Sequence, residues 1–386
     1  MKIGIDARAL SYGLTGIGYY LLEVIKELKK LDVHITLFST APLLVPADSL
    51  TGISVITGSS TKPIPHLIWS ELQLPLLLKK HPLDIFWGPA HRLPVLMPLS
   101  QATALTIHDL VWRKVPGTMR LYTRFQETLF MPRSLQRADI ILAVSASTAS
   151  DLSDYRPVFK DKIRYVPSGN GNSFLQSLDD NSDYQGNSPS SSCSSKLNKP
   201  YILFTGTIEP RKNLARLLAG FSALPKDLRQ AFQLVIAGGK GWGTINLQDE
   251  IQKYKLTEQV IVTGYVSEKE LSRLYAGAYC LAMPSLYEGF GMPILEANSF
   301  GVPVITSNTS SMPEVAGDAA ILVDPLEIED ITRSLRMLLE NRGLRETLSR
   351  RAIENAQRYS WEKTARLTLD AFKEAINSRN QRRKEV

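Results

Sequence analysis

Residues 285–303, Ser-Leu-Tyr-Glu-Gly-Phe-Gly-Met-Pro-Ile-Leu-Glu-Ala-Asn-Ser-Phe-Gly-Val-Pro, place a loop with two glycines directly before a helix. The apolar run 278–283 in front of this loop is typical of a buried strand. Gly289 and Gly291 lie in the loop, and Pro293 suits the first position of a helix, where an N–H group would have no partner. A glycine-rich loop that enters a helix presents free backbone N–H groups and the positive end of the helix dipole. The stretch therefore predicts a strand, an anion-binding turn and a helix.

Two carboxylates frame this turn. Glu288 precedes the glycines and Glu296 lies in the first turns of the helix, with seven residues between them. Because carboxylates accept hydrogen bonds from hydroxyl groups, the pair suits a ligand made of phosphates and sugars. The spacing alone is equally consistent with Glu296 complementing the helix dipole and Glu288 being a solvated loop residue.

The length of 386 residues predicts two or three domains, because it exceeds what one ordinary core accommodates. No uninterrupted apolar stretch reaches the roughly 18 residues that a membrane span needs. The opening residues, MKIGIDARAL, interrupt their apolar positions with Asp6 and Arg8, which predicts a buried strand rather than a signal peptide. Cys193 and Cys280 have neither the number nor the spacing of a metal site or a disulfide framework, which favours the reducing cytoplasm.

The net charge of +7 favours anionic partners. The basic residues are dispersed and form no recognition module for DNA or RNA, so we expect no nucleic-acid partner. A nucleotide diphosphate or an acidic membrane surface would suit the charge, and so would a soluble surface that is simply basic.

Strand-like and helix-like segments alternate through the first half of the chain, which predicts a parallel sheet covered on both faces. The expected helix is 16–31, and the expected strands are 2–6, 34–39, 54–56, 83–88, 103–108 and 140–145. Ligands bind at the carboxyl ends of the strands in such sheets. The residues that follow these strands are therefore candidates for a site.

Three positions after predicted strands are candidates. The loop 13–18, Gly-Leu-Thr-Gly-Ile-Gly, differs in order from a dinucleotide fingerprint, so we interpret it as a phosphate or sugar contact with Gly16 as backbone donor. His108 and Asp109 can bind hydroxyls or handle protons, although a single buried histidine is more often structural. Ser145 is expected to cap the helix that follows it.

Two further segments are basic and amphipathic. Residues 67–80 form an apolar, helix-like run that ends in two lysines, and residues 119–137 interleave four arginines with leucine, methionine and aromatic residues. A helix of this kind can lie on an anionic membrane surface. Core packing with a rim of arginines explains the same pattern, and these segments do not decide between the two.

The composition changes abruptly between 168 and 200, where Ser, Asn, Asp and Gly dominate and predict a linker without a core of its own. Beyond it, strands and helices alternate again and predict a second doubly wound sheet. Ser360 is expected to cap a final helix. The expected division is 1–175 for the N-terminal domain, 176–199 for the linker, 200–360 for the C-terminal domain and 361–386 for the final helix.

A basic turn opens the second half. The sequence Gly206-Thr-Ile-Glu-Pro-Arg211-Lys212-Asn follows the strand 201–205, at the same carboxyl edge as the two glutamates. Two adjacent cations there can neutralise a diphosphate, Arg211 through its planar guanidinium and Lys212 as a point charge. A merely solvated basic turn fits this position less well, because cations are disfavoured at the N-terminus of a helix.

Together these motifs resemble a known family. The run SLYEGFGMPILEAN, preceded by TGTIEPRKNLARLL, a Gly-Gly pair and VTGYVSEKEL, is similar to the retaining GT-B glycosyltransferases of family 4. The resemblance covers almost the whole chain, and the combination of the two glutamates with the Arg-Lys turn is specific. The opening MKIGIDARAL…TGIGYY and the segment TIHDLVW look like the branch that builds bacterial exopolysaccharides and O-antigens.

The resemblance implies an α/β fold of the GT-B type, in which two Rossmann-like domains face each other across a cleft and the last helix crosses back to the first domain. It implies that Arg211 and Lys212 contact the donor diphosphate. Glu296 would take the ribose hydroxyls and Glu288 the donor sugar. The catalytic residues that the resemblance implies are Arg211, Lys212, Glu288 and His108. The further donor-binding residues that it implies are Gly16, Gly206, Tyr265, Val266, Phe290, Gly291, Met292, Pro293 and Ile294, with Tyr265 and Val266 beside the base.

One segment departs from the family pattern. Residues 166–172, Val-Pro-Ser-Gly-Asn-Gly-Asn, stand where the family has Asn-Gly-Val-Asp, and the insertion after them is atypical. The departure concerns the hinge and leaves the donor site intact. No metal or other cofactor is expected, because the two cations replace it and no Asp-x-Asp pattern accompanies the site.

We therefore expect a retaining glycosyltransferase that moves a hexosyl group from a nucleotide-diphosphate sugar to a cell-envelope polysaccharide or lipid-linked glycan by front-side substitution. The resemblance favours UDP-glucose or a related UDP-hexose, followed by GDP-mannose. Such an enzyme would work in the cytoplasm, and a peripheral contact with the inner face of the membrane stays open. The alternatives are a sugar-nucleotide epimerase, an NAD(P)-dependent oxidoreductase and a non-catalytic glycan-binding subunit.

Overall fold

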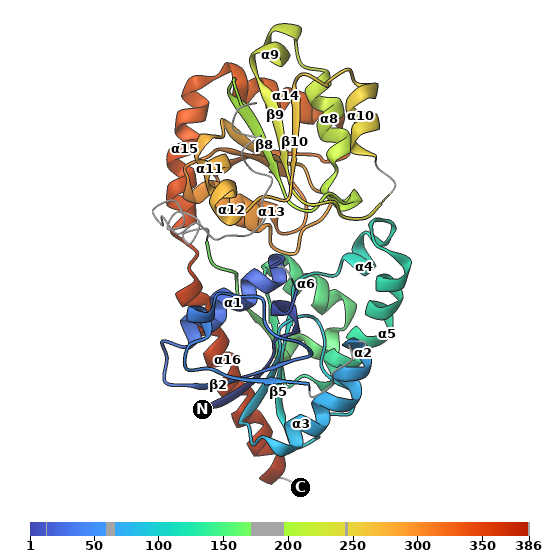
Figure 1. Ribbon diagram of the computed structural model, residues 1–386, viewed down its shortest axis with the longest axis vertical. Coiled ribbons are helices and arrows are strands. Elements are labelled where there is room, and N and C mark those ends of the chain that lie inside the picture. The colour runs from blue at the N-terminus through green and yellow to red at the C-terminus, as the bar shows by residue number, and fades with distance from the viewer. Residues whose placement is uncertain (13, 59–65, 171–196, 244–245, 385–386) are drawn as a thin grey trace. The chain divides into compact units, whose positions relative to one another are not determined.

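The computed structural model describes residues 1–12, 14–58, 66–170, 197–243 and 246–384, and the chain forms two compact units (Figure 1). The first unit comprises Met1–Leu110, Tyr122–Gly169 and Ser360–Val386, and the second comprises Val111–Leu121 and Asn170–Tyr359. The structure thus groups residues 111–121 with the second unit, whereas the predicted division placed them in the first domain. Residues 176–196 of the predicted linker lie outside the described residues.

The first unit contains a sheet of seven parallel strands. They are β1 Lys2–Asp6, β2 His34–Ser39, β3 Ser54–Thr57, β4 Ile85–Gly88, β5 Ala102–Ile107, β6 Ile140–Ala143 and β7 Ile163–Tyr165. Their order in the sheet is β3-β2-β1-β4-β5-β6-β7. Because β1 pairs with β2 on one side and β4 on the other, the strand order reverses between β1 and β4. The loops after these two strands therefore lie at the switch point, where doubly wound sheets bind ligands.

Helices cover this sheet. They are α1 Gly16–Leu28, α2 His66–Ile68, α3 Leu74–Lys80, α5 Leu121–Arg137, α6 Ala146–Tyr155 and α16 Trp361–Lys384, with a π-helical turn Trp69–Gln73 between α2 and α3. The final helix, α16, packs against α1 and against the strands β4, β5 and β6. The predicted cap of α16 is present, because Ser360 Oγ accepts a hydrogen bond from Lys363 N at 3.1 Å.

The second unit contains a sheet of six parallel strands. They are β8 Tyr201–Thr205, β9 Gln233–Ala237, β10 Val260–Gly264, β11 Cys280–Met283, β12 Val304–Ser307 and β13 Ala320–Val323. Their order is β10-β9-β8-β11-β12-β13, so the switch point lies between β8 and β11. The chain segments that leave these two neighbouring strands carry the Arg-Lys turn and the glycine loop. The topology thus brings the two predicted motifs to one place.

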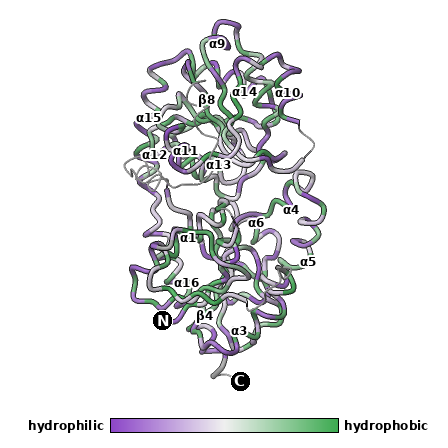
Figure 2. The backbone as a smooth tube through the Cα atoms, in the orientation of Figure 1, coloured by the Kyte–Doolittle hydropathy of each residue, from purple (hydrophilic) through white to green (hydrophobic). Residues whose placement is uncertain are grey.

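The helices of the second unit lie on both faces of its sheet, as Figure 1 shows for α8, α10 and α14 on one face and α11, α12 and α13 on the other. These helices are α8 Leu214–Ser222, α9 Lys226–Ala231, α10 Leu247–Lys253, α11 Glu268–Gly277, α12 Met292–Ser299, α13 Met312–Ala316, α14 Ile328–Glu340 and α15 Arg342–Ala356. The short helix α4 Val111–Lys114, which is grouped with this unit, packs against the 3-10 turn Pro116–Thr118. Phe204 of β8 and Leu217 and Phe221 of α8 are fully buried in the core between them. Figure 2 shows the hydrophobic colouring along β8 in this unit and along β4 in the first.

The two parallel sheets confirm the predicted α/β class with two Rossmann-like units. Some element bounds differ from the prediction. Helix α1 ends at Leu28 rather than residue 31, and β6 ends at Ala143 because Ser145 already caps the next helix. The strands β7 and β13, which we did not predict, are short edge strands. β7 lacks a continuous apolar run because Arg164 interrupts it, whereas β13 is apolar throughout but only four residues long.

Candidate functional site

The turn after β8 is fixed by close backbone packing. Gly206 has φ +122°, and a Cβ atom on Gly238 would lie 1.9 Å from the carbonyl oxygen of Gly206, so only glycine fits at 238. Asn213 ends the turn in the left-handed conformation with φ +60°. Its side-chain amide donates to the carbonyl oxygens of Pro284 at 2.9 Å and Pro325 at 2.7 Å. The turn after β8 is thereby tied to the loop after β11.

The predicted cations and carboxylate form one cluster at this junction. Lys212 Nζ lies 2.7 Å from Glu288 Oε1, and Arg211 Nη1 lies 2.5 Å from Glu288 Oε2. Arg211 also donates to the carbonyl oxygen of Tyr287 at 3.0 Å and pairs with Glu209 at 3.2 Å. Lys212 and Glu288 are buried, whereas a sixth of the Arg211 side chain is exposed. The interpretation as a solvated basic turn is therefore wrong.

Glu288 is an ionised, buried carboxylate. Burial on its own would raise the pKa of Glu288, but the charges of Arg211 and Lys212 outweigh it and lower this pKa from 4.5 to about 2. The backbone is held as well, because Glu288 N donates to Ser310 Oγ at 3.0 Å and Ser311 Oγ donates to the Glu288 carbonyl oxygen at 2.9 Å. These contacts rule out the solvated-loop interpretation of Glu288.

The glycine turn that follows Glu288 contains a positive φ angle, which glycine adopts without steric cost. Gly291 has φ +97° and caps α12, whose first residue is Met292, so Pro293 occupies the second helical position rather than the first. The Phe290 ring is buried and meets Tyr359 edge-on at 5.8 Å between ring centroids. Met292 and Pro293 are half-buried, whereas Ile294 is fully buried in the core. The turn thus presents Met292 and Pro293 beside the Glu288 cluster, and Ile294 anchors the helix.

Glu296 points into the unit rather than toward solvent. It is buried, and its Oε2 accepts a hydrogen bond from Tyr275 Oη at 2.6 Å, while Tyr275 Oη lies 2.8 Å from Thr205 Oγ1. Burial raises the pKa of Glu296 to about 7, despite the hydrogen bond from Tyr275 that opposes the shift. No acidic residue lies in the first turn of α12, so the explanation of Glu296 as a dipole partner is also wrong.

Tyr265 and Val266 follow β10 at the same carboxyl edge. The Tyr265 side chain is 71% exposed and Val266 is half-buried. A Cβ atom on Gly239, after the neighbouring strand β9, would lie 3.9 Å from the Tyr265 Cβ. The structure therefore leaves an exposed aromatic ring at the edge where a base could stack.

The sequence analysis missed several residues that support this site. Ser310 and Ser311 hold the Glu288 backbone, and Tyr275 holds the Glu296 carboxyl. Trp242 Nε1 donates to Glu209 Oε2 at 3.2 Å, which completes a chain from Trp242 to Arg211. Only Glu209 could have been suspected from the sequence, because it stands two residues before Arg211.

The remaining predicted residues belong to the first unit. Gly16 is the exposed first residue of α1. His108 is half-buried after β5, with Nε2 2.7 Å from the carbonyl oxygen of Pro89, and burial together with the neighbouring His91 lowers its pKa to about 3. Ser145 caps α6 as predicted, because its Oγ accepts from Thr148 N at 2.9 Å. Gly16 and His108 thus lie at the carboxyl edge of the first sheet.

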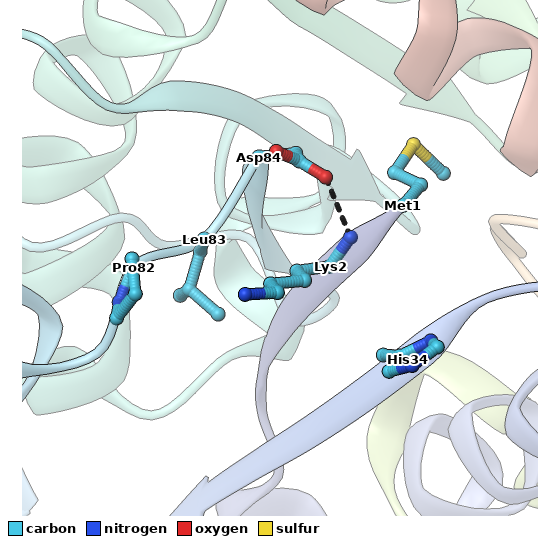
Figure 3. A pocket seen from close by; sticks show the side chains of 6 residues that line it. All are labelled: Met1, Lys2, His34, Pro82, Leu83 and Asp84. Atoms are coloured by element: carbon cyan, nitrogen blue, oxygen red, sulfur yellow. Dashed lines mark hydrogen bonds between the residues drawn. The ribbon is translucent and has the colours of Figure 1, made fainter.

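A shallow pocket lies at the opposite edge of that sheet (Figure 3). It is lined by Met1, Lys2, His34, Pro82, Leu83 and Asp84. Lys2 begins β1 and His34 begins β2, so the pocket is at the amino ends of the strands. Asp84 Oδ2 accepts a hydrogen bond from Lys2 N at 2.7 Å. The pocket contains none of the predicted site residues and lies away from the edge that binds ligands in such sheets.

Within the ranges that the structure describes, no group of three or more His, Cys, Asp or Glu side chains is arranged to hold a metal ion. Across the same ranges, no helix has both the length and the apolar character that crossing a membrane requires.

Comparison with known sequences covers most of the chain. Residues 14–169 match the model of Glycosyltransferase Family 4, and residues 191–374 match that of Glycosyl transferases group 1. The O-antigen chain mannosyltransferase B of Escherichia coli is 30% identical over 401 residues, which covers 97% of this chain and 100% of that protein. The serotype-specific mannosyltransferase WbdA of Escherichia coli is 30% identical over 63% of this chain and 30% of its own length.

Solved structures share the fold. Sucrose-phosphate synthase from Thermosynechococcus elongatus superposes with a TM-score of 0.73 at 17% identity, over 98% of this chain and 99% of that one. WaaG, a glycosyltransferase involved in lipopolysaccharide biosynthesis, superposes with a TM-score of 0.72 at 16% identity, over 96% of this chain and 99% of that one. The sequence matches and the shared fold confirm the predicted family, and the chain belongs to the family 4 glycosyltransferases of GT-B fold.

Proposed function

We propose that the protein transfers a hexosyl group from a nucleotide-diphosphate sugar with retention at the anomeric carbon and without a metal ion. The observation that carries this proposal is the cluster of Arg211, Lys212 and Glu288 at the switch point between β8 and β11. Arg211 and Lys212 are balanced in this cluster by Glu288 and Glu209, so the two cations are held in place just before the N-terminus of α12. Cationic N–H donors next to the free backbone N–H groups of a helix N-terminus favour a diphosphate.

The chemistry follows from where charge develops. As the bond between the anomeric carbon and the diphosphate lengthens, negative charge accumulates on the leaving diphosphate, and fixed cationic donors stabilise it. Glu288 holds the Lys212 ammonium and the Arg211 guanidinium in place through both carboxylate oxygens. We further propose front-side substitution, in which the acceptor hydroxyl attacks from the side of the leaving group. Trapping of a glycosyl adduct on any carboxylate of the protein would contradict that step.

Glu296 suits the ribose of the donor. Its carboxyl group is oriented by Tyr275, which in turn bonds Thr205 at the end of β8. A carboxylate accepts hydrogen bonds from two adjacent hydroxyls, and ribose offers such a pair. We therefore assign Glu296 to the ribose hydroxyls, Tyr265 and Val266 to the border of the base, and the turn 290–292 to the donor sugar.

For the donor, we now propose GDP-mannose ahead of UDP-glucose. Relatives named as mannosyltransferases support this order: the O-antigen chain mannosyltransferase B and WbdA of Escherichia coli, and RfbU of Salmonella typhimurium at 25% identity over 59% of this chain. The solved neighbour crystallised with UDP and glucose is 15% identical and supports the fold alone. By the same relatives, we propose an O-antigen or similar lipid-linked glycan as acceptor.

A donor panel tests the function. The full chain is incubated with radiolabelled GDP-mannose, UDP-glucose or UDP-galactose and with lipid-linked glycan from envelope extracts, and label in the glycan is counted. We expect transfer from GDP-mannose in the wild type and its near loss in Lys212→Ala, with Lys226→Ala on exposed α9 as the matched control. Transfer from a UDP-sugar alone would overturn the donor assignment. Lack of transfer and of donor hydrolysis with every sugar would favour a glycan-binding subunit.

The two enzymatic alternatives have separate readouts. A sugar-nucleotide epimerase converts the donor without an acceptor, so chromatography of the nucleotide sugars after incubation would show a new isomer. An oxidoreductase binds NADH, which a fluorescence titration detects. We expect no NADH binding, because the loop 13–18 lacks the dinucleotide order and its acidic partner. We expect no new isomer, because the proposed reaction moves the sugar to an acceptor.

A lipid-linked acceptor places the substrate at a membrane, and we propose that the first unit contacts that membrane through the exposed faces of α5 and of the helical segment 66–80. Both segments bond the loop between β4 and β5, Glu71 through Val95 N and Glu127 through Arg92. Tyr122, Phe125 and Leu129 form an exposed stripe on α5, and Ile68, Leu72 and Leu76 form another at a spacing of four residues. Exposed apolar stripes of this extent mark interaction surfaces.

Charge favours an anionic bilayer as the partner of these stripes. The only acidic residues of the two segments, Glu71 and Glu127, are both engaged: Glu71 Oε2 accepts from Val95 N at 2.7 Å, and Glu127 Oε1 accepts from Arg92 at 3.1 Å. Their basic residues Lys79, Lys80, Arg124 and Arg133 are exposed. Apolar side chains flanked by cations bind anionic lipid surfaces.

Vesicle flotation tests the membrane contact. The full chain is mixed with vesicles of phosphatidylcholine alone or with about a third of phosphatidylglycerol. We expect binding to the anionic vesicles that falls at least tenfold in the double variant Phe125→Ser/Leu129→Ser but not in Val158→Ser, which removes an equally exposed apolar residue. Equal binding of the double variant would refute the surface. A dimer that the double variant dissociates, without vesicle binding, would assign the stripe to a second copy instead.

A further inference from the structure

His91 is a histidine with 13% of its side chain exposed, in a backbone conformation that residues other than glycine rarely adopt. It follows β4 at the switch point of the first sheet, and its φ of +64° lies in the left-handed region. This conformation is unfavourable for most side chains, although histidine tolerates it better than most. Its backbone N–H donates to the carbonyl oxygen of Thr106 at 3.1 Å, which ties the turn to β5. The surrounding structure thus holds a strained residue beside His108.

Hydrogen-bond chemistry fixes where the protons of the two rings lie. His108 N is a donor, and it lies 3.0 Å from His91 Nε2, so that nitrogen accepts and the His91 proton is on Nδ1. The protonated Nδ1 of His91 faces the Glu127 carboxylate, with Nδ1 3.8 Å from Glu127 Oε2. His108 Nε2 lies 2.7 Å from the Pro89 carbonyl oxygen, which only accepts, so Nε2 carries the His108 proton. The two neutral rings therefore have opposite tautomers, and Nδ1 is the only acceptor of the His108 ring.

We propose that His91 is a positioning residue that fixes His108 so that its unprotonated Nδ1 accepts a hydrogen bond from a sugar hydroxyl. This inference rests on the proposed function, because a hexosyl transfer requires groups that bind sugar hydroxyls, and His108 lies at the carboxyl edge of the first sheet. The ring centroids of His91 and His108 are 5.5 Å apart, and the Tyr20 ring meets His108 edge-on at 4.9 Å. His108 is thus confined from two sides and bonded at its backbone and at Nε2.

The hydrogen bond from His108 N to His91 Nε2 depends on pH, because it needs an unprotonated Nε2 on His91. Burial alone would lower the pKa of His91, but the nearby Glu127 carboxylate and the charge of Asp109 raise it overall, against the opposing charge of Arg92. Once His91 is protonated, its Nε2 bears a proton and cannot accept from His108 N. Acid therefore loosens His108 through His91. His108 itself stays neutral there, because its pKa is about 3.

The test combines kinetics with a tautomer measurement on the full chain. We expect His91→Ala to lower kcat about tenfold, which corresponds to about 1.4 kcal/mol, and to abolish the acid limb of the pH–rate profile. His91→Asn is expected to restore most of kcat, because an amide oxygen accepts from His108 N and asparagine tolerates positive φ. His34→Ala at the amino edge of the sheet is the control and is expected to leave both unchanged.

Nitrogen-15 NMR of the histidine rings needs no substrate and separates this inference from the proposed function. We expect a proton on Nδ1 of His91 and on Nε2 of His108 in the wild type, and shifted or broadened His108 signals in His91→Ala, because His108 keeps its bond to Pro89 but loses the bond at its backbone N–H. A His108 proton on Nδ1 in the wild type, or a His91→Ala enzyme with unchanged kcat and acid limb, would overturn the inference. Absence of transfer by a wild type that shows the expected tautomers would instead count against the proposed function.

Discussion

Substitution of Lys212 probes the cluster on which the proposed function depends. Lys212 is buried against Glu288, which also bonds Arg211. Lys212→Ala therefore has two effects: it removes one donor to the leaving diphosphate, and it leaves a buried carboxylate with one cation instead of two. The first effect lowers turnover and the second lowers the free energy of unfolding, so the single variant alone does not separate them.

The structure gives the size of the stability effect. The cations lower the pKa of Glu288 from 4.5 to about 2. At about 1.4 kcal/mol per pKa unit, this corresponds to about 3 kcal/mol for both cations together. We expect Lys212→Ala to lose about 2 kcal/mol, because Arg211 still pairs with Glu288. Since the pKa is lowered in the folded state, this stability is present above pH 4.5 and is lost as the pH falls toward 2.

Urea unfolding and initial rates on four proteins resolve the two effects: the wild type, Lys212→Ala, Glu288→Gln and the double variant. We expect the double variant to be more stable than Lys212→Ala, because it no longer buries a poorly paired charge. Its turnover is expected to stay about a hundredfold or more below the wild type, as for loss of a transition-state donor. A double variant with wild-type turnover, or a Lys212→Ala protein with unchanged stability and rate, would refute the assignment of Lys212.

Three further outcomes test other parts of the site. Because the pKa of Glu296 is raised to about 7, the free energy of unfolding falls as the pH rises from 4.5 toward 7. Over the same change the carboxylate becomes ionised, and its affinity for the donor rises. Calorimetric Kd values from about pH 6 to 8 are therefore expected to fall in the wild type and stay flat in Glu296→Gln. Gly291→Ala forces a side chain to φ +97° with its Cβ 3.2 Å from Ile294 Cδ1, and we expect a loss of about 1–3 kcal/mol and weaker donor binding, unlike the unstrained control Gly117→Ala. EDTA is expected to leave the transfer rate within about twofold, and a loss restored by Mg²⁺ or Mn²⁺ would contradict a metal-independent reaction.

The central strands and the chemistry of their loops could be predicted from the sequence. Parallel strands buried on both faces form continuous apolar runs, as in 278–283, and the residue after each run lies at the carboxyl edge by topology. That rule alone picked out Arg211, Lys212 and His108. The edge strands β7 and β13 escaped it, because each is short and pairs with only one neighbouring strand. The exact start of α12 escaped it because it depends on the left-handed φ of Gly291.

The supporting residues escaped prediction for a different reason. Tyr275 reaches Glu296 from α11, and Ser310 reaches the Glu288 backbone from the segment after β12, each across more than twenty residues of sequence. Nothing in a serine or tyrosine on a helix or loop indicates which distant carboxylate it will bond. His91 illustrates the same limit, because its role depends on a positive φ and on the protonation of His108.

The carboxylate between the two cations explains why this site is difficult to predict and to dissect. Buried, unpaired cations are costly, because each loses its hydration without a compensating charge. Glu288 offsets that cost for both cations, and Glu209 also pairs with Arg211, so the same carboxylate stabilises the unit and holds the two donors of the site. Sequence spacing shows two cations and a carboxylate at one edge, but only their burial shows that they form a single electrostatic unit. A substitution of Arg211, Lys212 or Glu288 therefore also changes the charge balance of the two residues that remain, and its effect on turnover has to be measured together with its effect on stability.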